Sequence, residues 1–270
     1  MFLLQLVAKL IPTLKAAVKV SMQGGASDPL GVIVLQISVL LPILFAAWLM
    51  SNIEHRPFGD YGLQARDFFG KYYWQGIFWG LATETLVIVL IWTFRGFSFG
   101  TLALDAAGIA RYGTLWALAF ALVGLQEEFL YRGYLLFTLS TGIRFWPAAI
   151  VTSLIFGAVH LSNPGENLAG TFEIMVWALV ICFTIHRTGS LWFAAGFHAA
   201  GNFAETFLFS VNDSSTGARG QLLHSTMHGP AWLTGGSVGP EGSVFSYLAI
   251  LLFALAFHLL YRKSPDVLPA

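Results

Sequence analysis

The strongest constraint on this chain is a series of apolar runs, each close to the length that crosses a bilayer. A membrane-spanning helix needs about 20 predominantly apolar residues to cross a hydrocarbon layer of roughly 30 Å. Seven such runs follow one another, at residues 31–50, 74–94, 112–139, 145–161, 168–186, 190–209 and 243–261. The sequence therefore predicts an all-α fold, a polytopic transmembrane helix bundle.

The first twenty residues are apolar as well, but Lys9, Lys15 and Lys19 interrupt them. Such a segment is typical of an interfacial amphipathic helix or a short spanning helix, so residues 1–20 bring the prediction to seven or eight spans. A cleaved signal peptide is not expected, because the charges follow the apolar start rather than precede it.

Little of the chain is left for structure outside the membrane. Only residues 51–73 and 211–242 lie between apolar runs at any length, and neither can bury a core of its own. We expect residues 1–270 to form a single membrane domain. Its surroundings would be membrane lipids, with the cell membrane as the expected location of a multi-pass protein.

Composition supports the membrane assignment and excludes one class of partner. Of 270 residues, 56% are hydrophobic and 10% are charged, against about a quarter charged in ordinary soluble domains. The 14 basic and 14 acidic residues give a formal net charge of zero. Without a basic field to hold a phosphate backbone, no nucleic-acid partner is expected. Cys182, the single cysteine, excludes a disulfide framework and a cysteine-based metal site.

The third apolar run contains two adjacent carboxylates and a guanidinium, Glu127, Glu128 and Arg132. Ionisable groups are costly at membrane depth and often mark functional sites. Glu128 and Arg132 are four residues apart, so they share one helical face and can form a charge pair. Glu127 is turned about 100° from Glu128 on a helix. One carboxylate is thus expected to be structural and the other available for chemistry.

Two later runs contribute imidazoles. His160 ends the fourth run, just before Pro164 breaks the helix. In the sixth run His198 and Asn202 are four residues apart and share a face, which Glu205 continues. Three helices thus offer groups suited to acid/base work or metal ligation. Their convergence in a bundle would form a polar chamber within the membrane.

Each of these residues also has a structural interpretation. A lone histidine inside a membrane is more often a packing residue than a catalyst, and a lone Glu–Arg pair is often a structural clamp. The small residues beside the histidines allow membrane helices to approach closely. Two further carboxylates, Glu84 and Glu173, are expected either to be structural or to line the chamber.

Three motifs together carry a family resemblance: Glu127-Glu128-x-x-x-Arg132, Phe156-x-x-x-His160 and His198-x-x-x-Asn202. In that order on three membrane helices, they resemble the CPBP family of CAAX-prenyl-protease-like and bacteriocin-immunity-like membrane proteins, also called the Abi family. The resemblance covers residues 113–209, the expected catalytic core. It implies an intramembrane endopeptidase that hydrolyses a peptide bond near a membrane face. Its substrate would be a peptide or protein, with a lipidated C-terminal tail as one candidate.

The resemblance also implies a role for each matching residue. Glu127 would be the general base that activates water, and His160 would help to hold that water. His198 and Asn202 would steady the water or the developing oxyanion, while the Glu–Arg pair would brace the site. General base and oxyanion stabilisation are sufficient chemistry for peptide hydrolysis.

The use of a metal stays open at this point. Glu127, His160 and His198 would satisfy the three-ligand pattern of a catalytic zinc site, with water in the fourth position. The helical HExxH arrangement is absent. Asn202 and the neighbouring charge pair suit a water held by hydrogen bonds, so a metal-free glutamate mechanism is favoured over zinc.

Two functions from other classes compete with catalysis. One is a non-catalytic CPBP-like membrane scaffold or immunity protein, which would keep its binding after Glu127→Gln. The other is a proton or ion carrier that uses Glu84, Glu127, Glu173 and Glu205 as a relay. The absence of internal sequence repeats argues against the carrier. The complete set of motif residues argues for the protease.

Overall fold

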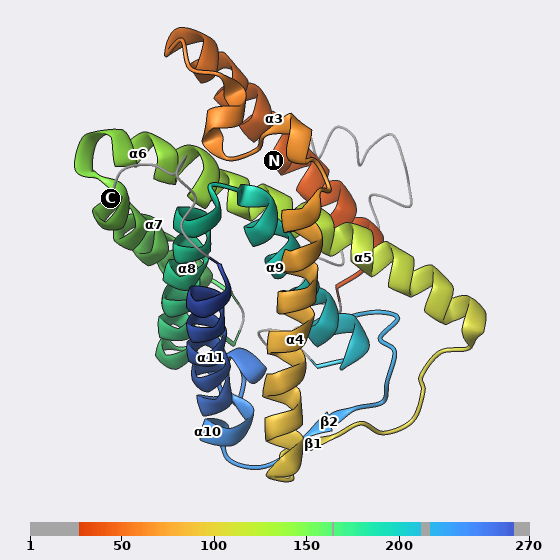
Figure 1. Cartoon of the computed structure of the whole chain (residues 1–270). Coiled ribbons are helices and arrows are strands. Elements are labelled where there is room, and N and C mark those ends of the chain that lie inside the picture. The colour runs from red at the N-terminus through yellow and green to blue at the C-terminus, as the bar shows by residue number, and fades with distance from the viewer. Residues whose placement is uncertain (1–26, 164, 212–216, 262–270) are drawn as a thin grey trace.

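A computed structural model describes residues 27–163, 165–211 and 217–261, which form an all-α bundle (Figure 1). Its helices are α3 (Pro29–Ile53), α4 (Lys71–Thr93), α5 (Ala106–Glu128), α6 (Leu136–Ile143), α7 (Phe145–His160), α8 (Leu168–Thr188), α9 (Leu191–Phe203), α10 (Ala231–Thr234) and α11 (Val244–Leu260). Each of the seven apolar runs is helical, so the predicted fold class is confirmed. The helix expected at residues 1–20 lies outside the described residues.

Four helical stretches are long and apolar enough to cross a membrane: α3, α4, Ala106–Ile143 and α8. Two more apolar helices, α7 and α11, are shorter. Large apolar side chains stay exposed on the outside of the bundle, among them Phe45, Phe78 and Leu251. Such a surface suits acyl chains rather than water. The chain is therefore an integral membrane protein, while seven or eight crossings remain a prediction.

Two π-helical segments interrupt the α-helical geometry. The first, η3 (Phe129–Leu135), joins α5 to α6, and the second, η4 (Ala204–Leu208), continues α9. π-Helical turns are rare in proteins, and those that do occur are often found at functional sites. Both segments begin next to motif residues, because Glu128 directly precedes η3 and Asn202 lies two residues before η4.

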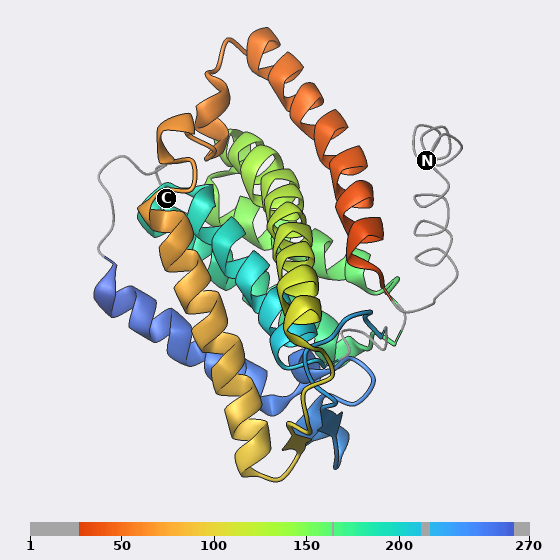
Figure 2. The same ribbon diagram turned by 90° about the vertical axis from the view of Figure 1, so that its right-hand side faces the viewer.

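Helix α9 is the centre of the bundle. It lies between α4 and α5, as Figure 2 shows, and every residue from Leu191 to Ala200 is buried. Small residues make this close packing possible. A Cβ atom added at Gly76 of α4 would overlap the Phe193 carbonyl oxygen of α9. At Gly80, one turn further along α4, it would overlap the Phe197 carbonyl oxygen.

Gly76→Ala is expected to lower the free energy of unfolding by about 1–3 kcal/mol, the usual range for overpacking a close contact. The added methyl meets backbone atoms, which cannot rotate away. Gly142→Ala in α6 is the matched control, because a Cβ atom there has nothing within 4 Å. Unfolding titrations in detergent would compare the two variants. Equal stability of both would contradict this account of the α4–α9 contact.

A short strand pair lies at one end of the bundle, near α10 and the end of α4 (Figure 1). Strand β1 (Phe97–Ser98) pairs antiparallel with β2 (Thr226–Met227), with Phe97 opposite Met227. Three 3-10 turns complete the connections: η1 (Phe58–Tyr61), η2 (Ala65–Asp67) and η5 (Pro240–Gly242). The sequence did not predict this strand pair, which ties the loop after α4 to the loop before α10.

Candidate active site

A cavity of about 280 Å³ lies inside the bundle and is lined by residues of α5, α7, α8 and α9. Four of the six predicted site residues line it: Glu127, His160, His198 and Asn202. The other two, Glu128 and Arg132, are fully buried behind its wall. The convergence of three helices that the spacing predicted is therefore present.

The two adjacent carboxylates have different environments. The Glu128 side chain is 0% exposed, and its Oε1 atom accepts a hydrogen bond from Arg132 Nη1 at 2.6 Å. The Glu127 side chain is 23% exposed and lines the cavity. Helix geometry separates neighbouring residues by about 100°, so one carboxylate faces the protein and the other faces the cavity.

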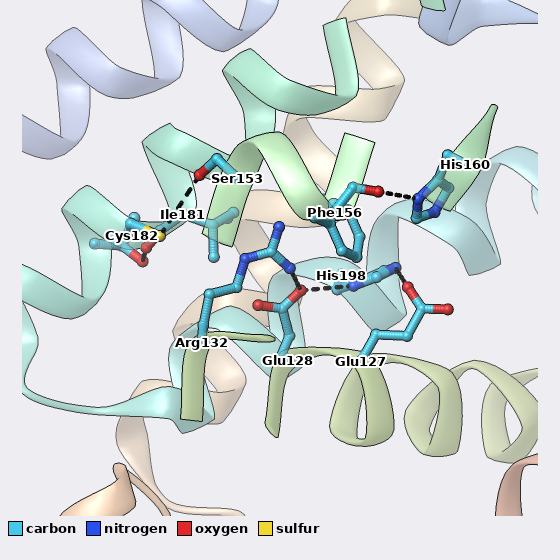
Figure 3. Close-up of polar contacts among 10 residues, drawn as sticks. Glu127, Glu128, Arg132, Ser153, Phe156, His160, Ile181, Cys182 and His198 are labelled. Carbon is cyan, nitrogen blue, oxygen red and sulfur yellow. Dashed lines mark hydrogen bonds and ion pairs between the residues drawn. The ribbon is translucent and has the colours of Figure 1, made fainter. Parts of the chain in front are cut away.

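His198 connects these two carboxylates (Figure 3). Its Nδ1 atom is 2.8 Å from Glu128 Oε1. A carboxylate paired with arginine only accepts hydrogen bonds, so Nδ1 carries the proton and donates. Nε2 then points toward Glu127, with 3.9 Å between Nε2 and Glu127 Oε2. This distance is too long for a direct hydrogen bond and suits a bridging water.

His160 is oriented by its own helix. Its Nδ1 atom lies 2.7 Å from the carbonyl oxygen of Phe156, one turn earlier in α7. Because a carbonyl oxygen only accepts, Nδ1 donates, and in the neutral form of the ring Nε2 is then the acceptor. The rings of His160 and Phe156 lie 4.4 Å apart. Both histidines are thus held through Nδ1 and keep Nε2 for other partners.

Comparison with known proteins finds a family match over the helices that line the cavity. Residues 109–204 match the family model described as type II CAAX prenyl endopeptidase Rce1-like. This region is therefore similar to the Rce1-like family. It runs from α5 to the first residue of η4. All six predicted site residues lie within it: Glu127, Glu128, Arg132, His160, His198 and Asn202.

A curated relative extends the similarity without adding a function. The uncharacterized protein YyaK of Bacillus subtilis is 28% identical over 163 residues, which are 57% of this chain and 51% of YyaK. The chain thus spans about half the length of this relative. No solved structure matches the chain.

The sequence analysis missed several residues that line this cavity. Trp177 of α8 lines the cavity, and its ring lies 5.0 Å from the His198 ring. Asn163 and Glu241 also line it. Asn163 lies three residues after His160, and this proximity in the sequence could have indicated it as a site residue. Nothing in the sequence near Glu241 indicated a site. Glu173, one of the two carboxylates left open, does line the cavity.

Glu205 was expected to continue the face of His198 and Asn202. It is buried in η4, and it is not among the described residues that line the cavity. The π-helical turn that begins at Ala204 changes the angle between successive residues, so α-helical spacing no longer predicts the shared face.

The same region contains the three residues that could ligate a zinc ion, Glu127, His160 and His198. A catalytic zinc ion needs three protein ligands converging at about 2 Å. Within the part of the chain that the structure describes, no group of three His, Cys, Asp or Glu side chains is close enough to hold a metal ion. Glu127, His160 and His198 line one cavity but do not form such a group, so the residues as placed do not fit a bound zinc ion.

Proposed function

We propose that this chain is an intramembrane endopeptidase in which Glu127 activates a water molecule for attack on a peptide bond. The observation that carries the proposal is that two adjacent carboxylates have different environments. Glu128 is fully buried and hydrogen-bonded to both Arg132 and His198, whereas Glu127 faces the cavity. The Rce1-like match supports a protease at the level of the family.

The reaction follows from the groups in the cavity. Glu127 takes one proton from the water molecule. The water oxygen attacks the substrate carbonyl carbon at the same time, and a C–O bond forms. The carbonyl oxygen becomes an oxyanion, and the Asn202 amide is a suitable hydrogen-bond donor to it. Glu127 then gives the proton to the amide nitrogen as the C–N bond breaks. The products are a carboxylic acid and an amine.

The two histidines position the water in this proposal. Each donates through Nδ1, to the Phe156 carbonyl oxygen or to Glu128. In this mechanism each ring acts in its neutral form and offers Nε2 as an acceptor, so a water that donates to Glu127 can donate its second proton to an imidazole. The Glu128–Arg132 pair fixes the orientation of His198, which makes it a bracing element rather than a reacting one.

The substrate would be a peptide or protein segment that reaches the cavity from a membrane face. Trp116, Phe120 and Val123 extend the cavity wall along α5. This apolar wall supports an apolar or lipid-bearing substrate, and a lipidated C-terminal tail is one candidate. The protein would act as a multi-pass component of the cell membrane, surrounded by lipid.

The proposed activity is tested with purified protein in nanodiscs and a diverse peptide library that includes lipidated C-terminal tails. Mass spectrometry would identify new termini, and Glu127→Gln protein prepared in parallel would reveal a contaminating protease. Cleavage by the wild type alone supports the endopeptidase. Equal peptide binding by both proteins, with cleavage by neither, would instead support the non-catalytic scaffold.

Chelation separates the glutamate mechanism from the zinc mechanism. Since no three potential ligands converge among the described residues, cleavage is expected to continue at an unchanged rate after incubation with EDTA or 1,10-phenanthroline. The measurement is the initial rate before and after chelation, followed by addition of zinc. Loss of activity that zinc restores would overturn the metal-free mechanism.

A further inference from the structure

Arg132 has an unusual environment for a buried cation. Its side chain is 1% exposed, and Nη1 donates to Glu128. Nη2 has no hydrogen-bond acceptor among the described residues. A buried charged N–H group without an acceptor is ordinarily destabilising. Some other feature of this environment must therefore stabilise the guanidinium.

Two aromatic rings take the place of the missing acceptor. The guanidinium carbon of Arg132 lies 4.0 Å from the ring centroid of Phe156 and 5.1 Å from that of Trp177. These rings come from α7 and α8 and lie nearly parallel, with their centroids 6.0 Å apart and an interplanar angle of 26°. The negative face of an aromatic ring attracts a cation, and the attraction is strongest where water is excluded.

The same rings contact the catalytic histidines. Phe156 accepts the His160 hydrogen bond through its carbonyl oxygen, and its ring lies 6.5 Å from the His198 ring at 89°. The Trp177 ring meets the His198 ring at 78°. Displacement of Arg132 would move Glu128, which accepts from His198. The aromatic pair is thus coupled to His198 both directly and through the buried ion pair.

We infer that Phe156 and Trp177 are positioning residues for the proposed hydrolysis. Together they form an aromatic clamp that holds Arg132 through their ring faces and thereby aims His198 at the cavity. The inference rests on the proposed function for its effect on rate. The clamp itself is a matter of side-chain geometry and can be measured without activity.

Phe156→Leu tests the clamp, because leucine fills much of the same space without a ring face. We expect kcat to fall about 30-fold, equivalent to about 2 kcal/mol of activation free energy, with little change in KM. Phe156→Tyr keeps the ring face and should restore most of kcat. Phe145→Leu is the matched control, since Phe145 is equally buried in α7 and packs against Trp146 and His186 instead.

A second readout does not require cleavage. In protein with ¹⁵N-labelled histidine rings, the His198 signals are assigned by their loss in His198→Gln. Phe156→Leu should shift them away from the Nδ1-protonated, hydrogen-bonded form, and Phe145→Leu should leave them in place. If no variant or wild type cuts any peptide, the proposed function fails while the histidine signals still test the clamp. Identical signals and rates in Phe156→Leu and Phe145→Leu would overturn it.

Discussion

Glu127→Gln is expected to reduce kcat by roughly 10²–10⁴-fold, the range that a general base contributes. Glutamine has nearly the same shape but cannot accept the proton from water. The fold should be retained, because Glu127 faces a cavity and lies 3.9 Å from His198 Nε2, beyond hydrogen-bond distance. Initial rates in nanodiscs and unfolding midpoints in detergent would be measured on the same preparations.

Glu54→Gln provides the matched carboxylate control for that experiment. Glu54 is exposed at the end of α3 and accepts a hydrogen bond from Tyr61, away from the cavity. Its replacement is expected to leave kcat unchanged. If Glu127→Gln cleaved as fast as Glu54→Gln, Glu127 would not be the base and the proposed mechanism would have to be abandoned.

Arg132→Met has the largest expected effect on stability, a loss of about 3–5 kcal/mol in the free energy of unfolding. The variant leaves the Glu128 carboxylate 0% exposed and without its cation. A buried charge that loses its partner retains the full cost of its removal from water. Unfolding titrations in detergent and susceptibility to limited proteolysis would both report the loss.

A double variant distinguishes this cause from simple loss of packing. Glu128→Leu combined with Arg132→Met removes both charges and fills the space with apolar atoms, so most of the lost stability should return. Activity should not return, because His198 Nδ1 no longer has its acceptor. A double variant as unstable as Arg132→Met alone would show that the unpaired charge is not the cause.

The sequence predicted the helices well because a single physical requirement governs them. Crossing a hydrocarbon layer requires a long apolar run, and each run at residues 31–50 through 243–261 is helical. Local spacing was equally informative within one helix. The four-residue interval from Glu128 to Arg132 predicted a charge pair, and the structure contains it at 2.6 Å.

Contacts between helices could not be predicted in this way. Trp177 lies on α8 among many apolar residues, and no local pattern distinguishes it from a lipid-facing tryptophan. Its contact with Arg132 depends on the packing of α8 against the neighbouring helices. The π-helical segments were missed for a related reason, because nothing in residues 129–135 or 204–208 departs from ordinary helical composition. The roles assigned to the site residues remain predictions.

The enclosure of α9 has a consequence for biosynthesis. This helix carries His198, whose hydrogen-bond partner Glu128 lies on α5, so alone in lipid α9 would expose an unpaired polar group. It is not among the four helical stretches long and apolar enough to cross a membrane by themselves. Helices α4 and α5, between which it packs, both precede it in the chain. Both neighbours are therefore already synthesised when α9 emerges, so the partners that bury it are present when it enters the membrane.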